Sequence, residues 1–103
     1  MKTIKLSNCE VDIKESMSWG AGEEINGVLM SGADIKSESD FSFNGGVLLE
    51  AKFKALELLV VKIRDGKKEF DFSRDWMNEL SKEDGDKLFD AVDDVAQVIK
   101  KKQ

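Results

Sequence analysis

The chain has 103 residues, of which 41% are hydrophobic and 36% are charged, and it carries a formal net charge of −5. This length predicts a single domain over residues 1–103, and the composition excludes general disorder. No run approaches the ~20 apolar residues that a membrane-spanning helix needs. These totals indicate a small folded protein without a membrane partner.

Acidic groups are concentrated in the N-terminal half of the chain. Residues 1–50 carry 4 basic and 9 acidic groups, whereas residues 51–103 carry 12 of each. This distribution argues against a nucleic-acid partner, because such partners are attracted by clustered Lys and Arg. The first residues alternate charged and apolar side chains, unlike a signal peptide, and Cys9 is the one cysteine. We therefore expect a cytoplasmic protein.

Residues 2–14 predict a β-hairpin. Apolar and charged residues alternate on both sides of the turn "SNC". A lone hairpin is marginal in water, so its apolar face must cover a core. The side chains expected on that face are Ile4, Leu6, Val11 and Ile13.

A weak helix is expected after Ser18, which is a good N-cap residue. Its expected apolar stripe consists of Ile25, Val28, Leu29 and Trp19. Three glycines, each costing about 1 kcal/mol relative to alanine, weaken it: Gly20, Gly22 and Gly27. The polar stretch 36–46 that follows is interpreted as a loop, in which Phe41 and Phe43 are either tucked under the domain or offered to a partner.

Residues 47–59 predict the strongest helix, which we expect to be central because nearly all of its residues outside the edge formed by Glu50, Lys54 and Glu57 are apolar. Glu50 and Lys54 have the favourable spacing of four on its surface. The period then changes, and Asp65-Gly66 predicts a two-residue hairpin turn. The expected cross-strand pairs are Ile63–Lys68, Val61–Phe70, Leu59–Phe72 and, on the other face, Lys62–Glu69. The alternative is that the helix continues to Ile63 and Gly66 ends it.

Two helices are predicted at the C-terminus. Asp71 or Ser73 caps a short one containing Trp76, Met77 and Leu80, and Ser81 caps the next in a capping box with Asp84. The final helix has an apolar stripe at spacings of three and four, namely Leu88, Phe89, Val92, Val95, Ala96 and Ile99. Lys100–Lys102 are interpreted as the C-terminal charges that favour the helix dipole. The predicted fold class is therefore α+β.

The sequence contains little catalytic chemistry. It has no histidine, so neither the usual general base nor a Cys–His or Ser–His pair exists. One cysteine without histidine excludes an ordinary zinc site, and neither Asp-Gly site has the carboxylate spacing of a calcium loop. We expect no enzyme activity, no cofactor and no metal.

The order of the elements and three motifs resemble a known family. "SWGAGEE" is similar to its W-G-x-x-E-E helix start, "VKIRDG" to its V-x-I-x-D-G segment, and "WMNELSKEDGDKLFDAV" to its short helix, L-S-x-E-D cap and final helix. The chain thus resembles the small tail assembly chaperones of long-tailed bacteriophages and prophages. The likeness spans most of the sequence.

The resemblance implies a non-enzymatic protein, in the cytoplasm of a bacterial host, that binds a helical tape-measure protein. The alternatives are a small acidic phage-type inhibitor or binding protein and a structural tail-completion subunit. If the chaperone hypothesis holds, the cargo site should be apolar and partly covered. The candidate residues are Phe41, Phe43, Trp76 and Met77; the competing interpretation is that they complete a small core.

Overall fold

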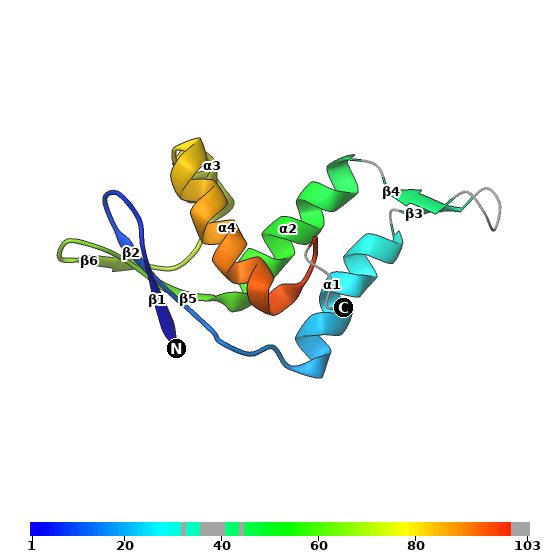
Figure 1. Cartoon of the computed structure of the whole chain (residues 1–103), viewed down its shortest axis with the longest axis horizontal. Coiled ribbons are helices and arrows are strands. Elements are labelled where there is room, and N and C mark those ends of the chain that lie inside the picture. The colour runs from blue at the N-terminus through cyan, green and yellow to red at the C-terminus, as the bar shows by residue number, and fades with distance from the viewer. Residues whose placement is uncertain (32, 36–40, 44, 100–103) are drawn as a thin grey trace.

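The computed structural model describes residues 1–31, 33–35, 41–43 and 45–99, and it has the expected α+β fold (Figure 1). Its main sheet is antiparallel with the strand order β1-β2-β5-β6. The strands of this sheet are β1 (Lys2–Lys5), β2 (Glu10–Ile13), β5 (Val60–Asp65) and β6 (Lys68–Phe70). A separate two-stranded sheet joins β3 (Ala33–Ile35) and β4 (Phe41–Phe43).

The helices are α1 (Trp19–Ser31), α2 (Gly45–Leu59), α3 (Arg74–Glu79) and α4 (Lys82–Ala96). Helix α2 contacts both α1 and α4 and leads directly into β5 (Figure 1). The expectation that the apolar helix near residues 47–59 is central is therefore confirmed. None of the helices in the described part of the chain is long and apolar enough to span a membrane.

The N-terminal hairpin is confirmed, and β5 completes its burial. Ile4 lies opposite Val11 in β1 and β2, and Val11 in turn lies opposite Ile63 in β5. All three side chains are buried. The hairpin is therefore half of a larger sheet with one apolar face. An isolated hairpin is only marginally stable in water, so it needs such additional strands.

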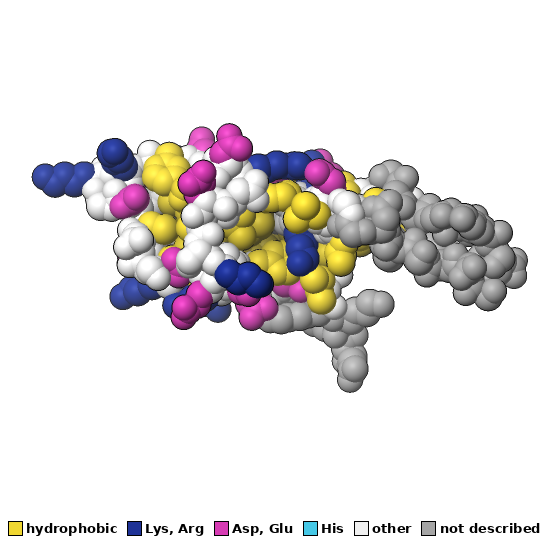
Figure 2. Space-filling model, turned by 90° about the horizontal axis from the view of Figure 1, so that it is seen from above, with side chains coloured by type: hydrophobic (Ala, Val, Ile, Leu, Met, Phe, Trp, Pro, Cys, Tyr) yellow, Lys and Arg dark blue, Asp and Glu magenta, His cyan; other side chains and the backbone are white. Residues whose placement is uncertain are grey.

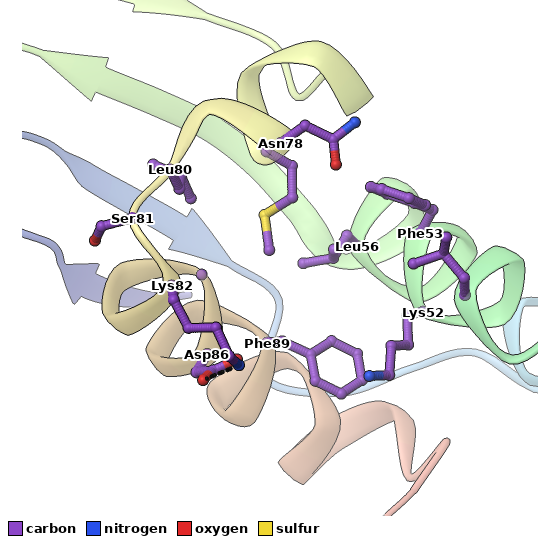
Figure 3. Close-up of a pocket in the computed structure, with 12 residues that line it drawn as sticks. Lys52, Phe53, Leu56, Asn78, Leu80, Ser81, Lys82, Asp86 and Phe89 are labelled. Carbon is purple, nitrogen blue, oxygen red and sulfur yellow. Dashed lines mark hydrogen bonds and ion pairs between the residues drawn. The ribbon is translucent and has the colours of Figure 1, made fainter. Parts of the chain in front are cut away.

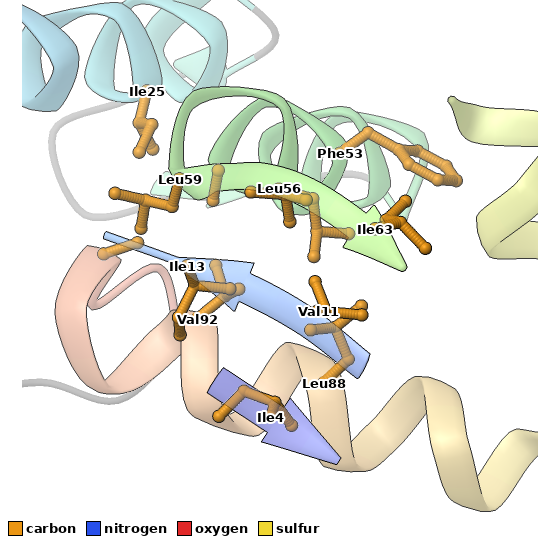
Figure 4. Packing of buried hydrophobic residues seen from close by; sticks show 13 residues of the cluster. Ile4, Val11, Ile13, Ile25, Phe53, Leu56, Leu59, Ile63, Leu88 and Val92 are labelled. Carbon is orange, nitrogen blue, oxygen red and sulfur yellow. The ribbon is translucent and has the colours of Figure 1, made fainter. Parts of the chain in front are cut away.

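Helices α2 and α4 cover the apolar face of this sheet. Figure 4 shows Leu88 and Val92 of α4 lying against the first hairpin, and Leu56 and Leu59 of α2 facing β5. Each of these leucines and Val92 is at most 2% exposed. Burial of such a side chain contributes about 1.5–3 kcal/mol, so the stability of the domain resides in this layer.

The second hairpin is confirmed, but its register differs from the predicted one by two residues. Ile63 pairs with Phe70 and Asp65 with Lys68, which leaves Gly66 and Lys67 as the central turn residues. A turn centred on Asp65-Gly66 would give a positive φ at Gly66 and, in its commonest form, at Asp65 as well. Gly66 has a φ of +64°, but Asp65 does not have a positive φ. A positive φ at the first central residue only, usually a glycine, is typical of a type II′ turn.

The charge pairs of the second hairpin differ accordingly. Arg64, rather than Lys62, lies opposite Glu69. The ammonium of Lys62 instead lies 3.0 Å from the carboxylate of Asp71. A shift of two residues keeps every side chain on its original face, and for this reason the apolar pattern could not distinguish the two registers.

Two expectations for the first helix and the loop after it require correction. Ser18 caps α1 as expected, because its Oγ accepts a hydrogen bond from the Ala21 N–H at 3.1 Å. Trp19, however, is 82% exposed and does not belong to the buried stripe. Phe41 and Phe43 lie in strand β4, not in a loop, where they pair with Ile35 and Ala33. Residues 36–40 and 44 of the expected loop lie outside the described residues.

Both predicted caps of the C-terminal helices are present. Ser73 caps α3 through a hydrogen bond from the Trp76 N–H, and Ser81 caps α4 through one from the Asp84 N–H, both at 3.1 Å. The second hydrogen bond of the predicted capping box, from the Ser81 N–H to the Asp84 carboxylate, is wrong. The Asp84 carboxylate instead accepts from the Ser7 hydroxyl at 3.0 Å and from the Ser7 N–H, so the start of α4 is tied to the first hairpin.

Helix α4 ends earlier than its apolar pattern predicts. Gln97 adopts a left-handed conformation with φ +56°, and its N–H donates to the Asp93 carbonyl. The buried Asp93 carboxylate accepts from the N–H groups of Val98 and Ile99. These hydrogen bonds to the Asp93 side chain take the place of the backbone hydrogen bonds of a further helical turn. Ile99 therefore lies beyond the helix and is half exposed, and Lys100–Lys102 lie outside the described residues.

Candidate functional site

Three helices enclose a groove of about 240 Å³ that is open to solvent on one side. Figure 3 shows its walls, which come from α2, α3 with the turn after it, and the first half of α4. The apolar lining residues are Leu49, Phe53, Leu56, Met77, Leu80 and Phe89. The polar ones are Lys52, Asn78, Ser81, Lys82 and Asp86, and Gly85 completes the lining.

Contacts to α2 help to position α3, none of whose side chains is fully buried. Arg74 donates to both carboxylate oxygens of Glu50 at 2.8 Å and to Glu57 at 3.1 Å. Its guanidinium also lies 4.9 Å from the centre of the Phe53 ring. The predicted Glu50–Lys54 partnership on α2 is therefore replaced by a bidentate pair between two helices, which has a defined geometry.

Electrostatics at this contact follow from the same geometry. The hydrogen bonds from Arg74 hold the pKa of the Glu50 carboxyl below its usual range. The two carboxylates raise the pKa of the Arg74 guanidinium further above its already high value. All three side chains are exposed, so the contact orients α3 more than it stabilises the fold.

The opposite side of α3 is held by aromatic contacts. Trp76 meets Phe70 and Phe72 edge to face, with both ring centroids 6.2 Å from its own. Such pairs contribute about 0.5–1.5 kcal/mol beyond the area that they bury. Helix α3 is thus fixed between the end of the second hairpin and α2, and Met77 is presented to the groove.

The groove has an apolar interior and charged edges. Leu49 is 51% exposed, and Met77 and Phe89 are half-buried, so the apolar lining is only partly covered. At the edges, the Lys52 ammonium lies 5.1 Å from the centre of the Phe89 ring, and Lys82 pairs with Asp86 at 2.7 Å. Figure 2 shows hydrophobic side chains gathered in the middle of one face, with Lys, Arg, Asp and Glu side chains around them.

The size of the groove limits what it can hold. Pockets for small-molecule ligands have volumes of about 300–1,000 Å³ and bury most of the ligand surface. A groove of about 240 Å³ that is open along one side is better suited to a few side chains that project from a larger partner. The groove is therefore smaller and more open than a typical small-molecule pocket.

The four candidate residues lie in two separate parts of the molecule. Met77 lines the groove, whereas Trp76 packs in the aromatic cluster beside it. Phe41 and Phe43 lie in β4, and Figure 1 places the β3–β4 pair at the opposite end of the molecule from α3. The side chains of Phe41 and Phe43 lie outside the described part of the structure.

Most of the groove residues were not among the sequence candidates. Leu49, Phe53 and Leu56 come from α2, and Phe89 comes from α4, both of which were expected to use their apolar faces for the core. Part of the signal lies in α2, where apolar residues occupy both sides of the charged edge formed by Glu50, Lys54 and Glu57. A helix of that kind has more apolar surface than one core can cover.

Polar clusters elsewhere on the molecule have structural roles. The Asp12 carboxylate accepts hydrogen bonds from the Thr3 hydroxyl, at 2.7 Å, and from Arg64. These contacts, led by that of Thr3, lower the pKa of Asp12. Burial, followed by the charges of Asp65 and Asp84, raises the pKa of the Cys9 thiol, which disfavours the reactive thiolate. No group of three potential metal ligands occurs within the described ranges.

No protein-family model matches the sequence, and no curated protein or solved structure is significantly similar to the chain. The function is therefore inferred from the groove and from the motifs of the sequence.

Proposed function

We propose that this protein is a non-enzymatic tail assembly chaperone of a long-tailed bacteriophage or prophage, and that it binds a helical tape-measure-like chain. The observation that carries the proposal is the partly covered apolar groove between α2, α3 and α4. The motifs "SWGAGEE", "VKIRDG" and "WMNELSKEDGDKLFDAV" support the family assignment through their resemblance to these chaperones.

The shape and chemistry of the groove suit a helix. Amphipathic helices dock into apolar grooves through side chains spaced three, four and seven residues apart. Met77, Phe53 and Phe89 supply the adaptable thioether and aromatic surface that accepts several different apolar sequences. A chaperone of a long helical chain needs this tolerance, because successive segments of the cargo differ in sequence.

The charge of the protein suits a holding role. A chain that keeps apolar helices in solution must remain soluble itself while it exposes an apolar surface. The net charge of −5 supplies repulsion between copies. Complexes of the protein with its cargo segments would therefore repel one another.

Co-expression with a helical tape-measure fragment tests the proposal. We expect the wild-type protein to increase the soluble fraction of the fragment and Met77→Asp to abolish this effect, because a carboxylate would be buried in the occupied groove. Met30→Asp is the matched control, since Met30 is 56% exposed on α1 and does not line the groove. It should protect the fragment as the wild type does.

Two results would contradict the proposal. One is a fragment that stays insoluble with the wild-type protein present at equal or higher concentration. The other is equal protection by wild type and Met77→Asp. The alternatives predict different behaviour: a tail-completion subunit should be retained in finished tails, and an acidic inhibitor should bind its target whether or not Met77 is replaced.

A further inference from the structure

The two lysines that line the groove differ in how their charges are balanced. The Lys82 ammonium is 2.7 Å from the Asp86 carboxylate, one helical turn further along α4. The Lys52 ammonium lies over the Phe89 ring instead. Within the described part of the chain, no carboxylate lies at ion-pair distance from Lys52. Lys52 is therefore the uncompensated charge of the groove.

The position of Lys52 makes its charge sensitive to any partner. Its side chain is half-buried, and Figure 3 shows its nitrogen next to the Phe89 ring that forms one wall. An apolar helix that docks against Phe89 would remove further water from the ammonium. Loss of this water costs free energy unless an opposite charge replaces it. The ring face compensates only part of this cost.

We propose, on the basis of the function proposed above, that the groove selects amphipathic helices with an acidic residue beside their apolar stripe, and that Lys52 sets this preference. A carboxylate one turn from the apolar side chains in the groove would reach the Lys52 ammonium at the edge. Lys82 should contribute less, because its ammonium pairs with Asp86 and its side chain is 88% exposed to water. The cargo is thus recognised by one charge as well as by its apolar face.

The test uses two synthetic amphipathic peptides of about 20 residues, long enough for appreciable helix formation. They are identical except for one Glu or Gln beside the leucine stripe, and their affinities are measured by fluorescence anisotropy. The wild-type protein should bind the Glu peptide about fivefold more tightly, the upper range for a partly exposed ion pair. Lys52→Gln should bind both peptides equally. Lys87→Gln, which makes the same charge change on an exposed part of α4 outside the groove, should keep the wild-type preference.

The outcomes separate this proposal from the proposed function. If the wild type binds both peptides equally and Met77→Asp abolishes binding, the acidic preference is wrong but the groove remains a helix-binding site. If Lys87→Gln loses the preference as fully as Lys52→Gln, net charge and not Lys52 is responsible, and the proposal fails. If neither peptide binds the wild type, both the acidic preference and the groove assignment are wrong.

Discussion

Substitutions at Gly85 should change the stability of the fold and the proposed binding of cargo separately. Gly85 lies inside α4 and lines the groove, and a Cβ added to it would lie 3.8 Å from the Met77 Cε, an ordinary van der Waals contact. Glycine in a helix interior costs about 1 kcal/mol relative to alanine. Gly85→Ala should therefore stabilise the fold by about that amount and raise Tm by about 4 °C.

A larger residue at the same position should block the groove. Leucine has nearly the helix propensity of alanine, so Gly85→Leu should keep the gain in stability while its side chain fills the groove beside Met77. We expect the affinity for a helical tape-measure fragment to fall by about tenfold or more, which corresponds to about 1.4 kcal/mol. Thermal melts and anisotropy titrations of the same samples measure both effects.

Gly27 provides the matched control, because it lies inside α1 and a Cβ there would meet nothing within 4 Å. Gly27→Ala and Gly27→Leu should stabilise the fold by a similar amount and leave binding unchanged. If Gly85→Leu folds and binds cargo as tightly as the wild type, the groove is not the binding site. If Gly85→Ala lowers Tm, the placement of the Met77 side chain beside Gly85 is wrong.

Three further predictions concern the fold. Ser81→Ala should lower the free energy of unfolding by about 0.5–2 kcal/mol in denaturant melts, because it removes the cap of α4; an unchanged melt would refute the cap. Gln97→Gly should raise the free energy of unfolding by about 1 kcal/mol, since glycine adopts the left-handed conformation without strain; a loss would refute it. The pKa of Asp12 is lowered in the folded state, so its stabilisation is present above its unfolded pKa, about 4, and is lost as pH falls through its folded pKa. Asp12→Asn should therefore reduce the loss of stability below about pH 4, and an unchanged pH profile of stability would contradict this assignment.

Much of the fold was predictable because local signals agreed with the tertiary structure. Ser18, Ser73 and Ser81 each cap a helix, and Gly66 adopts a positive φ in a hairpin turn. The register of that hairpin was not predictable from its own residues. It depends on the pairing of β5 with β2, which includes an irregularity between Asp12 and Ile13, and contacts between distant segments determine such details.

The candidate site was predictable only in part. Met77 was identified as an adaptable apolar residue on a short helix, and it lines the groove. Phe89 belongs to the predicted apolar stripe of the final helix, and Phe53 lies in the helix predicted to be central. The sequence does not show that both also face a gap between α2 and α4. The interruption between Glu79 and Lys82 places α3 beside this gap. A groove formed by three helices depends on their relative placement, about which helix periodicity carries no information.

Methyl NMR of the four methionines gives the most direct test of the central claim that cargo binds in the groove. Met77 lies in the groove, whereas Met1 and Met30 are exposed away from it and Met17 packs near α1. Titration with a helical tape-measure fragment should shift the Met77 methyl signal strongly and leave those of Met1 and Met30 in place. A bound fragment that shifts Met30 or Met1 while Met77 stays unchanged would contradict the account.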